Sequence, residues 1–238
     1  MGINAVKARR RARPAIGIAA LCAVAVLAGC ALTQQAAVKQ SDVSALVNLA
    51  RLTPGGKGQA DLRWVAPGAQ WTAYKAVLIN PVTFWADKDD AGVPAKDQQA
   101  LCNYFHQAIY KQFSQKFRVA DEPGPGVMRL QVAIVDAKAA TPGLRSISVL
   151  EPHVRLLATL KYLATGTFPF VGGAQVEARF SDSESGAHLG EFVDRRLGGG
   201  SLKAGLQWEW GDAENAMNEW AGTAATRVAS WTSGSATP

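Results

Sequence analysis

The side chains best suited to chemistry in this sequence are its few cysteines and histidines: Cys22, Cys30, Cys102, His106, His153 and His188. Cys102 and His106 are four residues apart, a spacing at which two side chains of one helix could bind the same metal ion. Two ligands do not make a metal site, so a packed thiol on a helix is the better interpretation. The sequence contains no G-x-S-x-G motif of serine hydrolases. We therefore assign no catalytic residue, metal ligand or cofactor.

A second cluster with metal-binding chemistry is a loop of three aspartates: Asp87, Asp89 and Asp90. An EF-hand aligned at Asp87 has Gly92 at its sixth position, as the loop requires. However, Ala91 replaces the fifth ligand, and Gln98 stands where the bidentate glutamate belongs. The sequence favours a solvated turn before a helix and leaves a weak, nonstandard cation site as the alternative.

Cys30 has the most specific surroundings of the three cysteines. Residues 1–13 carry five basic and no acidic side chains, and an apolar run from Ala15 to Ala28 follows. Leu27-Ala28-Gly29-Cys30 resembles the lipobox of bacterial lipoproteins, in which two small residues fit the peptidase and the cysteine thiol is acylated. A run this short does not span a membrane comfortably. The pattern predicts a signal peptide over 1–29, cleavage between Gly29 and Cys30, and lipidation of Cys30 with acyl chains such as palmitate.

Removing residues 1–29 changes the charge of the chain. Five of its 25 basic residues leave with the signal, so that 20 remain against 19 acidic residues, a net charge of +1 in place of +6. A nearly neutral protein is not typical of nucleic-acid binding, and we predict no nucleic-acid partner. Cys22 also leaves and Cys30 is acylated, which leaves Cys102 as the single thiol and excludes an intramolecular disulfide.

The mature chain is long enough for one domain of ordinary size. Residues 31–40 are small and polar, and we expect residues 30–50 to form a lipidated tether whose first ten residues reach at most about 35 Å. A single globular envelope domain is expected over 51–232, with a frayed tail over 233–238.

Hydrophobic periodicity predicts the main elements of this domain. Strands are expected at 76–80, with an extended course at 82–85, and at 127–136. A hairpin is expected from 174–182 and 189–196, and long helices at 97–117 and from Asp212 to Trp231. Residues 150–164 fit either a helix or a strand. The order predicts an α/β (α+β) two-layer domain, with a mixed sheet of about four strands and two main helices packed on it.

The seven tryptophans are candidate binding residues. Trp220 and Trp231 fit the buried stripe of the last helix. The other five flank the first strand or precede the last helix: Trp64, Trp71, Trp85, Trp208 and Trp210. If these side chains are exposed, they would form a groove for a glycan, a peptide or a partner protein; if they are buried, they belong to the core.

Two stretches carry a resemblance to a known family: LTPGGKGQADLRWV at 52–65 and YKAVLINPVTFW at 74–85. They resemble the bacterial lipoproteins of domain of unknown function 3313, and FSDSESGAHL at 180–189 and the tryptophan-containing last helix fit the same pattern. The resemblance covers most of residues 41–232. It implies an envelope lipoprotein and brings no catalytic residue.

Three functions remain open at this level. The first is a noncatalytic, lipid-anchored envelope protein that binds a partner or supports an envelope assembly. The second is a carrier of an apolar ligand such as lipid, and the third is a tethered envelope hydrolase. In bacterial lipoproteins that stay in the inner membrane, an aspartate commonly follows the lipidated cysteine. Here Ala31 follows Cys30. By resemblance to such lipoproteins, we expect this protein to reach the periplasmic face of the outer membrane. Two or three acyl chains would make this attachment stable.

Overall fold

Three long antiparallel strands form the centre of the sheet: β7 (Val127–Lys138), β8 (Gly173–Asp182) and β9 (His188–Gly198). They belong to a computed structural model that describes residues 33–85, 93–139, 172–198 and 210–238. The alternation of Met128, Leu130 and Val132 places these apolar side chains on one face of β7. The predicted strand at 127–136 and the predicted hairpin are confirmed, and the three strands are longer than predicted by one to three residues.

Short strands extend both edges of this centre. On the β9 edge, β1 (Thr33–Ala36) and β3 (Leu62–Val65) pair antiparallel with successive parts of β9, and β2 (Thr53–Pro54) pairs with β3. On the β7 edge, β4 (Ala76–Ile79) and β5 (Thr83–Phe84) pair parallel with β7, and β6 (Arg118–Val119) pairs with β4. The described residues thus form a nine-stranded mixed sheet. The prediction of about four strands was wrong. The strand at 76–80 is β4 and the extended course at 82–85 contains β5, but β1, β2, β3 and β6 have only two to four residues and were not predicted from the sequence.

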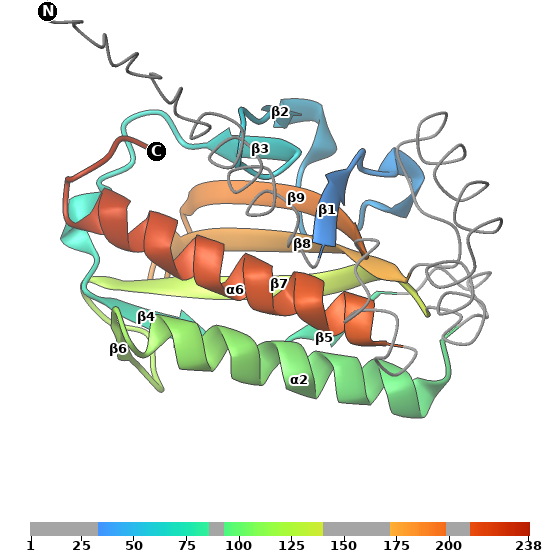
Figure 1. Cartoon of the computed structure of the whole chain (residues 1–238). Helices are drawn as coiled ribbons and strands as arrows, with labels where there is room; N and C mark the ends of the chain where they lie inside the picture. The colour runs from blue at the N-terminus through green and yellow to red at the C-terminus, as the bar shows by residue number, and fades with distance from the viewer. Residues whose placement is uncertain (1–32, 86–92, 140–171, 199–209) are drawn as a thin grey trace, which may run out of the picture. The chain divides into compact units, whose positions relative to one another are not determined.

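Two long helices, α2 (Ala95–Phe113) and α6 (Gly211–Thr232), lie side by side on one face of the sheet (Figure 1). Their apolar stripes pack on β7, β8 and β9 and form the main core, which includes Phe105, Met128 and Met217. The prediction that two helices pack on the sheet is correct. However, α2 ends at Phe113, four residues earlier than predicted. In the described part of the chain, no helix is long and apolar enough to cross a membrane.

The opposite face of the sheet is polar and is covered by residues 37–52, which we call the strap. The strap holds two short 3-10 helices, Gln40–Asp42 and Leu49–Arg51, and a third 3-10 helix lies at Trp71–Ala73. The sequence predicted a tether through residue 50. Instead, residues 33–36 form β1 and the strap is bound by buried polar side chains of the sheet.

Several predictions concern residues outside the described ranges: the signal peptide at 1–29, the lipobox with Cys30, the aspartates of the 87–90 loop, residues 150–164 and Trp208.

Candidate functional site

An apolar cavity of about 120 Å³ lies between the helices and the sheet. The walls come from α2, α6 and the three long strands, and they are rich in aromatic rings: Phe105, Phe113, Phe180, Phe192, Trp220 and Trp231. Residues 58–60, in the loop between β2 and β3, complete the lining at the β3 edge. The alternating pattern of the strands creates this cavity, because Val132, Ala178 and Phe192 are register partners whose side chains face the helices.

The polar part of the cavity lining, which we call the polar rim, is centred on Asp194 of β9. Its carboxylate accepts hydrogen bonds from Trp220 Nε1 at 2.7 Å, from the Asp61 backbone N–H at 2.9 Å and from Arg196 Nε at 3.3 Å. A fourth bond comes from Gln35 Nε2 in β1. A single buried carboxylate therefore joins β1, β9, α6 and the loop before β3.

Arg196 extends this rim toward β1 and α6. Its Nη1 lies 2.5 Å from Glu219 Oε1 in α6 and 3.3 Å from Thr33 Oγ1 in β1. The hydroxyl of Thr33 also donates to Glu219 Oε2 at 2.5 Å. These contacts fix the first described strand against α6, next to the cavity.

The polar face of the sheet carries a second set of interacting groups, beneath the strap. Gln175, Glu177 and Glu191 are fully buried there. Glu177 accepts from Ser44 N at 2.5 Å and Ser44 Oγ at 2.6 Å, and Glu191 accepts from Asn48 N at 2.9 Å. The buried side chains thus bind backbone N–H groups of a segment about 130–140 residues away in sequence.

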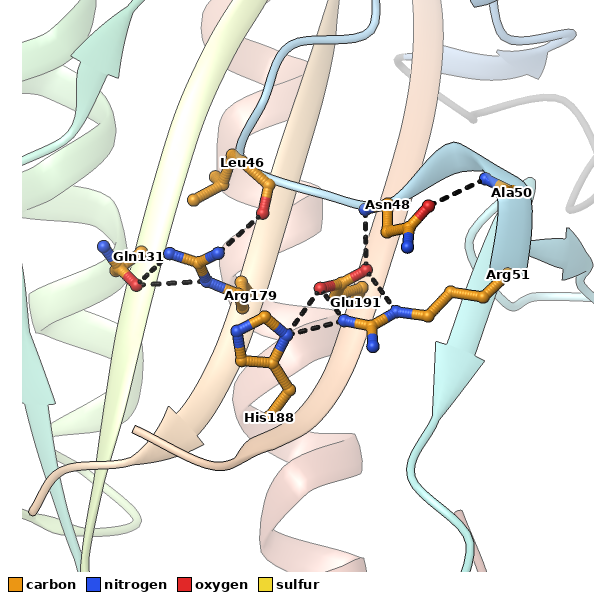
Figure 2. A network of polar contacts seen from close by, with 8 residues as sticks. All are labelled: Leu46, Asn48, Ala50, Arg51, Gln131, Arg179, His188 and Glu191. Atoms are coloured by element: carbon orange, nitrogen blue, oxygen red, sulfur yellow. Dashed lines mark hydrogen bonds and ion pairs between the residues drawn. The ribbon is translucent and has the colours of Figure 1, made fainter. Parts of the chain in front are cut away.

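Figure 2 shows how basic side chains complete this network. Arg51 donates to both carboxylate oxygens of Glu191, with a distance of 3.0 Å from Nε. His188 Nδ1 lies 2.6 Å from Arg51 Nη2 and 3.0 Å from Glu191 Oε1. Arg179 donates to Leu46 O at 3.0 Å and to Gln131 Oε1 at 2.9 Å. The groups are engaged with one another and with the strap, which favours a structural role.

The two buried glutamates differ in acidity. Burial raises the pKa of Glu177 above its ordinary value, and the charge of Glu191 adds to the rise, although hydrogen bonds from Ser44 oppose it. Burial also acts to raise the pKa of Glu191. Hydrogen bonds from Arg51 and Asn48, together with the charges of Arg51 and His188, outweigh burial and bring this pKa below its ordinary value.

Cys102 and His106, considered above as a pair of metal ligands, both lie on α2. Cys102 is buried in α2, and burial raises the pKa of its thiol. Within residues 33–85, 93–139, 172–198 and 210–238, no group of three histidine, cysteine or acidic side chains is arranged to hold a metal ion.

The candidate tryptophans do not form one patch either. Trp71 and Trp210 are buried, Trp64 is half-buried with the guanidinium of Arg51 3.9 Å from its ring centre, and Trp85 is 46% exposed. The tryptophans that do line the cavity are Trp220 and Trp231, for which the sequence predicts places in the buried stripe of the last helix. Sequence reasoning missed Asp194, Arg196 and Arg227, because only the fold brings them to one cavity.

Comparison with known proteins places the chain in a family. The family model described as "Protein of unknown function (DUF3313)" matches residues 25–224, so the chain belongs to this family and the resemblance seen in the sequence is confirmed. The chain is 26% identical over 150 residues to the uncharacterized lipoprotein YdcL of Escherichia coli K12, covering 63% of this chain and 67% of the relative. YdcL of Escherichia coli O157:H7 matches equally. A lipoprotein is therefore among its relatives.

The chain is also similar to solved structures of PelC dodecamers from Paraburkholderia phytofirmans. One, of a variant with a single leucine-to-methionine substitution, has a TM-score of 0.35 at 10% identity, covering 68% of this chain and 92% of that chain. A second has a TM-score of 0.35 at 9% identity, covering 68% of this chain and 95% of that chain.

Proposed function

We propose that this protein is a lipid-anchored, noncatalytic envelope protein that binds a partner protein through the cavity between α6 and the sheet. The predicted anchor is Cys30, exposed as the first mature residue after removal of 1–29, and the predicted location is the periplasmic face of the outer membrane. The observation that carries the proposal is the apolar, aromatic-lined cavity with a polar rim. Such a combination is the usual form of a binding site.

The volume of the cavity indicates the size of its occupant. About 120 Å³ is comparable to the ~150 Å³ of an apolar cavity that accepts benzene, and it is well below the ~300–1,000 Å³ of sites for whole ligands. One large apolar side chain of a partner fits this space, as anchor residues do at protein interfaces. The same volume argues against a carrier that encloses a lipid.

The lining also favours binding over hydrolysis. Among the described residues that form it, Asp194 is the single carboxylate, and none is a serine, cysteine or histidine. Asp194 is already engaged by several donors. Glycoside hydrolysis, for comparison, uses two carboxylates flanking the bond that breaks.

The predicted anchor and the first strand are close in sequence. Thr33 is three positions after Cys30, which corresponds to at most about 10 Å of extended chain. A lipid on Cys30 would therefore hold the domain close to the membrane, where an envelope partner is concentrated.

Site-specific photo-crosslinking in native membranes tests this proposal. A photoreactive amino acid at Thr223, which is exposed and lines the cavity, is expected to give one discrete crosslinked protein. The same group at Thr226, also exposed on α6 but outside the lining, is the matched control and should not give it.

Filling the cavity provides the second half of this test. Ala224→Phe adds a ring inside the lining, whereas Thr226→Phe adds the same ring outside it. The crosslink from position 223 should be lost in the first variant and kept in the second. Equal crosslinking from positions 223 and 226, or a crosslink unaffected by Ala224→Phe, would contradict the proposal.

A further inference from the structure

One arginine lines the cavity, and a second lies close enough to it for their charges to interact. Arg227 of α6 belongs to its lining and donates to Gly58 O at 2.7 Å. Arg63 of β3 is the register partner of Phe192 in β9, so both side chains stand on the face of the sheet that α6 covers. Phe192 is itself part of the lining. The cross-strand row of side chains that begins in the apolar core therefore reaches a cation at β3.

These two guanidinium groups differ from the other arginines near them. Arg51 is paired with Glu191, and Arg196 is paired with Asp194 and Glu219. In the described part of the chain, neither Arg63 nor Arg227 has a carboxylate within 4.0 Å. Burial, and then the positive charge of Arg227, lower the pKa of Arg63. Two half-buried like charges repel each other unless an anion lies between or beside them.

We propose that the partner segment bound at the cavity is acidic: its apolar side chain fills the cavity while a neighbouring carboxylate binds Arg63 and Arg227. This inference rests on the proposed function and specifies the chemistry of the partner. Arginine suits the role because its planar, forked donors match the two oxygens of a carboxylate. A peptide is chosen over a fatty acid because about 120 Å³ holds one side chain and not a long acyl chain.

A pair of small probes separates the charge from the apolar group. N-acetyl-phenylalanine carries a ring beside a carboxylate, and N-acetyl-phenylalanine amide carries the same ring without the charge. Binding to the full-length, lipidated protein in phosphatidylcholine vesicles can be followed by tryptophan fluorescence, because Trp220 and Trp231 line the cavity. We expect the acid to bind about tenfold to 100-fold more tightly than the amide, the range for a hydrogen bond to a charged group.

Variants assign this preference to the two arginines. In the double variant Arg63→Gln with Arg227→Gln, the acid and the amide should bind equally. Arg118→Gln is the matched control, because Arg118 is exposed on β6 at the opposite edge of the sheet, and it should keep the full preference. Ala224→Phe should abolish binding of both probes.

Three outcomes would overturn the inference. Equal binding of acid and amide to the wild-type protein, with both lost in Ala224→Phe, would refute the acidic partner and leave the proposed function standing. A preference that survives the double arginine variant would place the carboxylate elsewhere. Displacement of both probes by laurate at far lower concentration would identify a lipid as the occupant and would refute the proposed function as well.

Discussion

Glu177 and Glu191 are buried on the same face of neighbouring strands, yet their pKa values move in opposite directions. Both carboxylates bind the strap. Glu191 binds the guanidinium of Arg51, whereas the hydrogen bonds that Glu177 accepts from the described residues come from the hydroxyl and the backbone N–H of Ser44. Burial therefore dominates at Glu177, and the neighbouring cation dominates at Glu191. One strap is attached at two points that respond differently to pH.

Glu177→Gln is expected to be tolerated at neutral pH. Because the folded pKa of Glu177 lies above its ordinary value of 4.5, its contribution to stability is complete below that value and is lost as pH rises through the folded pKa. Glutamine stays neutral at every pH and retains an oxygen for Ser44 N. The free energy of unfolding of this variant should match or exceed that of the wild type at pH 8, and the advantage should shrink toward pH 4. Urea titrations of both proteins at several pH values measure this difference. A variant that is much less stable than the wild type at pH 8, with a smaller difference at pH 4, would contradict the argument.

Glu191→Gln is expected to behave in the opposite way. Its folded pKa lies below the ordinary value of 4.5, so its contribution is present above that value and is lost as pH falls through the folded pKa. The substitution removes the partner of Arg51 and should reduce stability by about 3 kcal/mol at pH 7. The difference from wild type should diminish in acid. The same urea series measures it, with Glu122→Gln, an exposed carboxylate before β7, as the control.

Gly198→Ala tests the contact between the end of β9 and the start of α6. A Cβ atom at Gly198 would lie 2.2 Å from Cγ of Asp212, whose Oδ2 accepts from Gly172 N at 2.8 Å. Both groups would have to move, and we expect a loss of about 2 kcal/mol. Gly124→Ala is the control, since its nearest neighbour would be 3.9 Å away. The midpoints of thermal unfolding of the two variants measure this loss. Equal midpoints would show that the contact between Gly198 and Asp212 is loosely packed.

Cys102 is expected to be unreactive in the folded protein. It is buried in α2, and burial raises the pKa of its thiol, so little thiolate is present or accessible. Maleimide labelling of mature protein should be about 100-fold slower in buffer than in urea. An added thiol in Asn103→Cys, exposed one residue further along α2, should label rapidly. Fast labelling of wild-type Cys102 would mean that α2 opens readily.

Cys30→Ser should leave the domain folded but stop its processing. Serine cannot form the thioether, so the variant should keep its signal peptide or be found outside the membrane fraction that holds the wild type. Mass spectrometry and membrane fractionation measure both effects. Cys22→Ser is the control and should be processed normally. A Cys30→Ser protein that is cleaved and fractionates like the wild type would show that Cys30 is not the anchor.

Local patterns determined a large part of this fold. The apolar steps of α2 and α6, the alternation along β7 and the turn between β8 and β9 are properties of neighbouring residues, and each predicted the element that is observed. The family was also recognisable, because its motifs are continuous stretches of sequence.

The tertiary structure decided what depends on partners distant in the chain. Strands of two residues, such as β2 and β6, are defined by their pairing, and the strap is held on the sheet by Glu177 and Glu191, which bind its backbone N–H groups. No local sequence pattern predicts that a backbone N–H will donate to a carboxylate more than 130 residues away. The same holds for the arginines near the cavity, because the charges of Arg63 and Arg227 interact only once β3 joins the sheet and α6 packs on its apolar face.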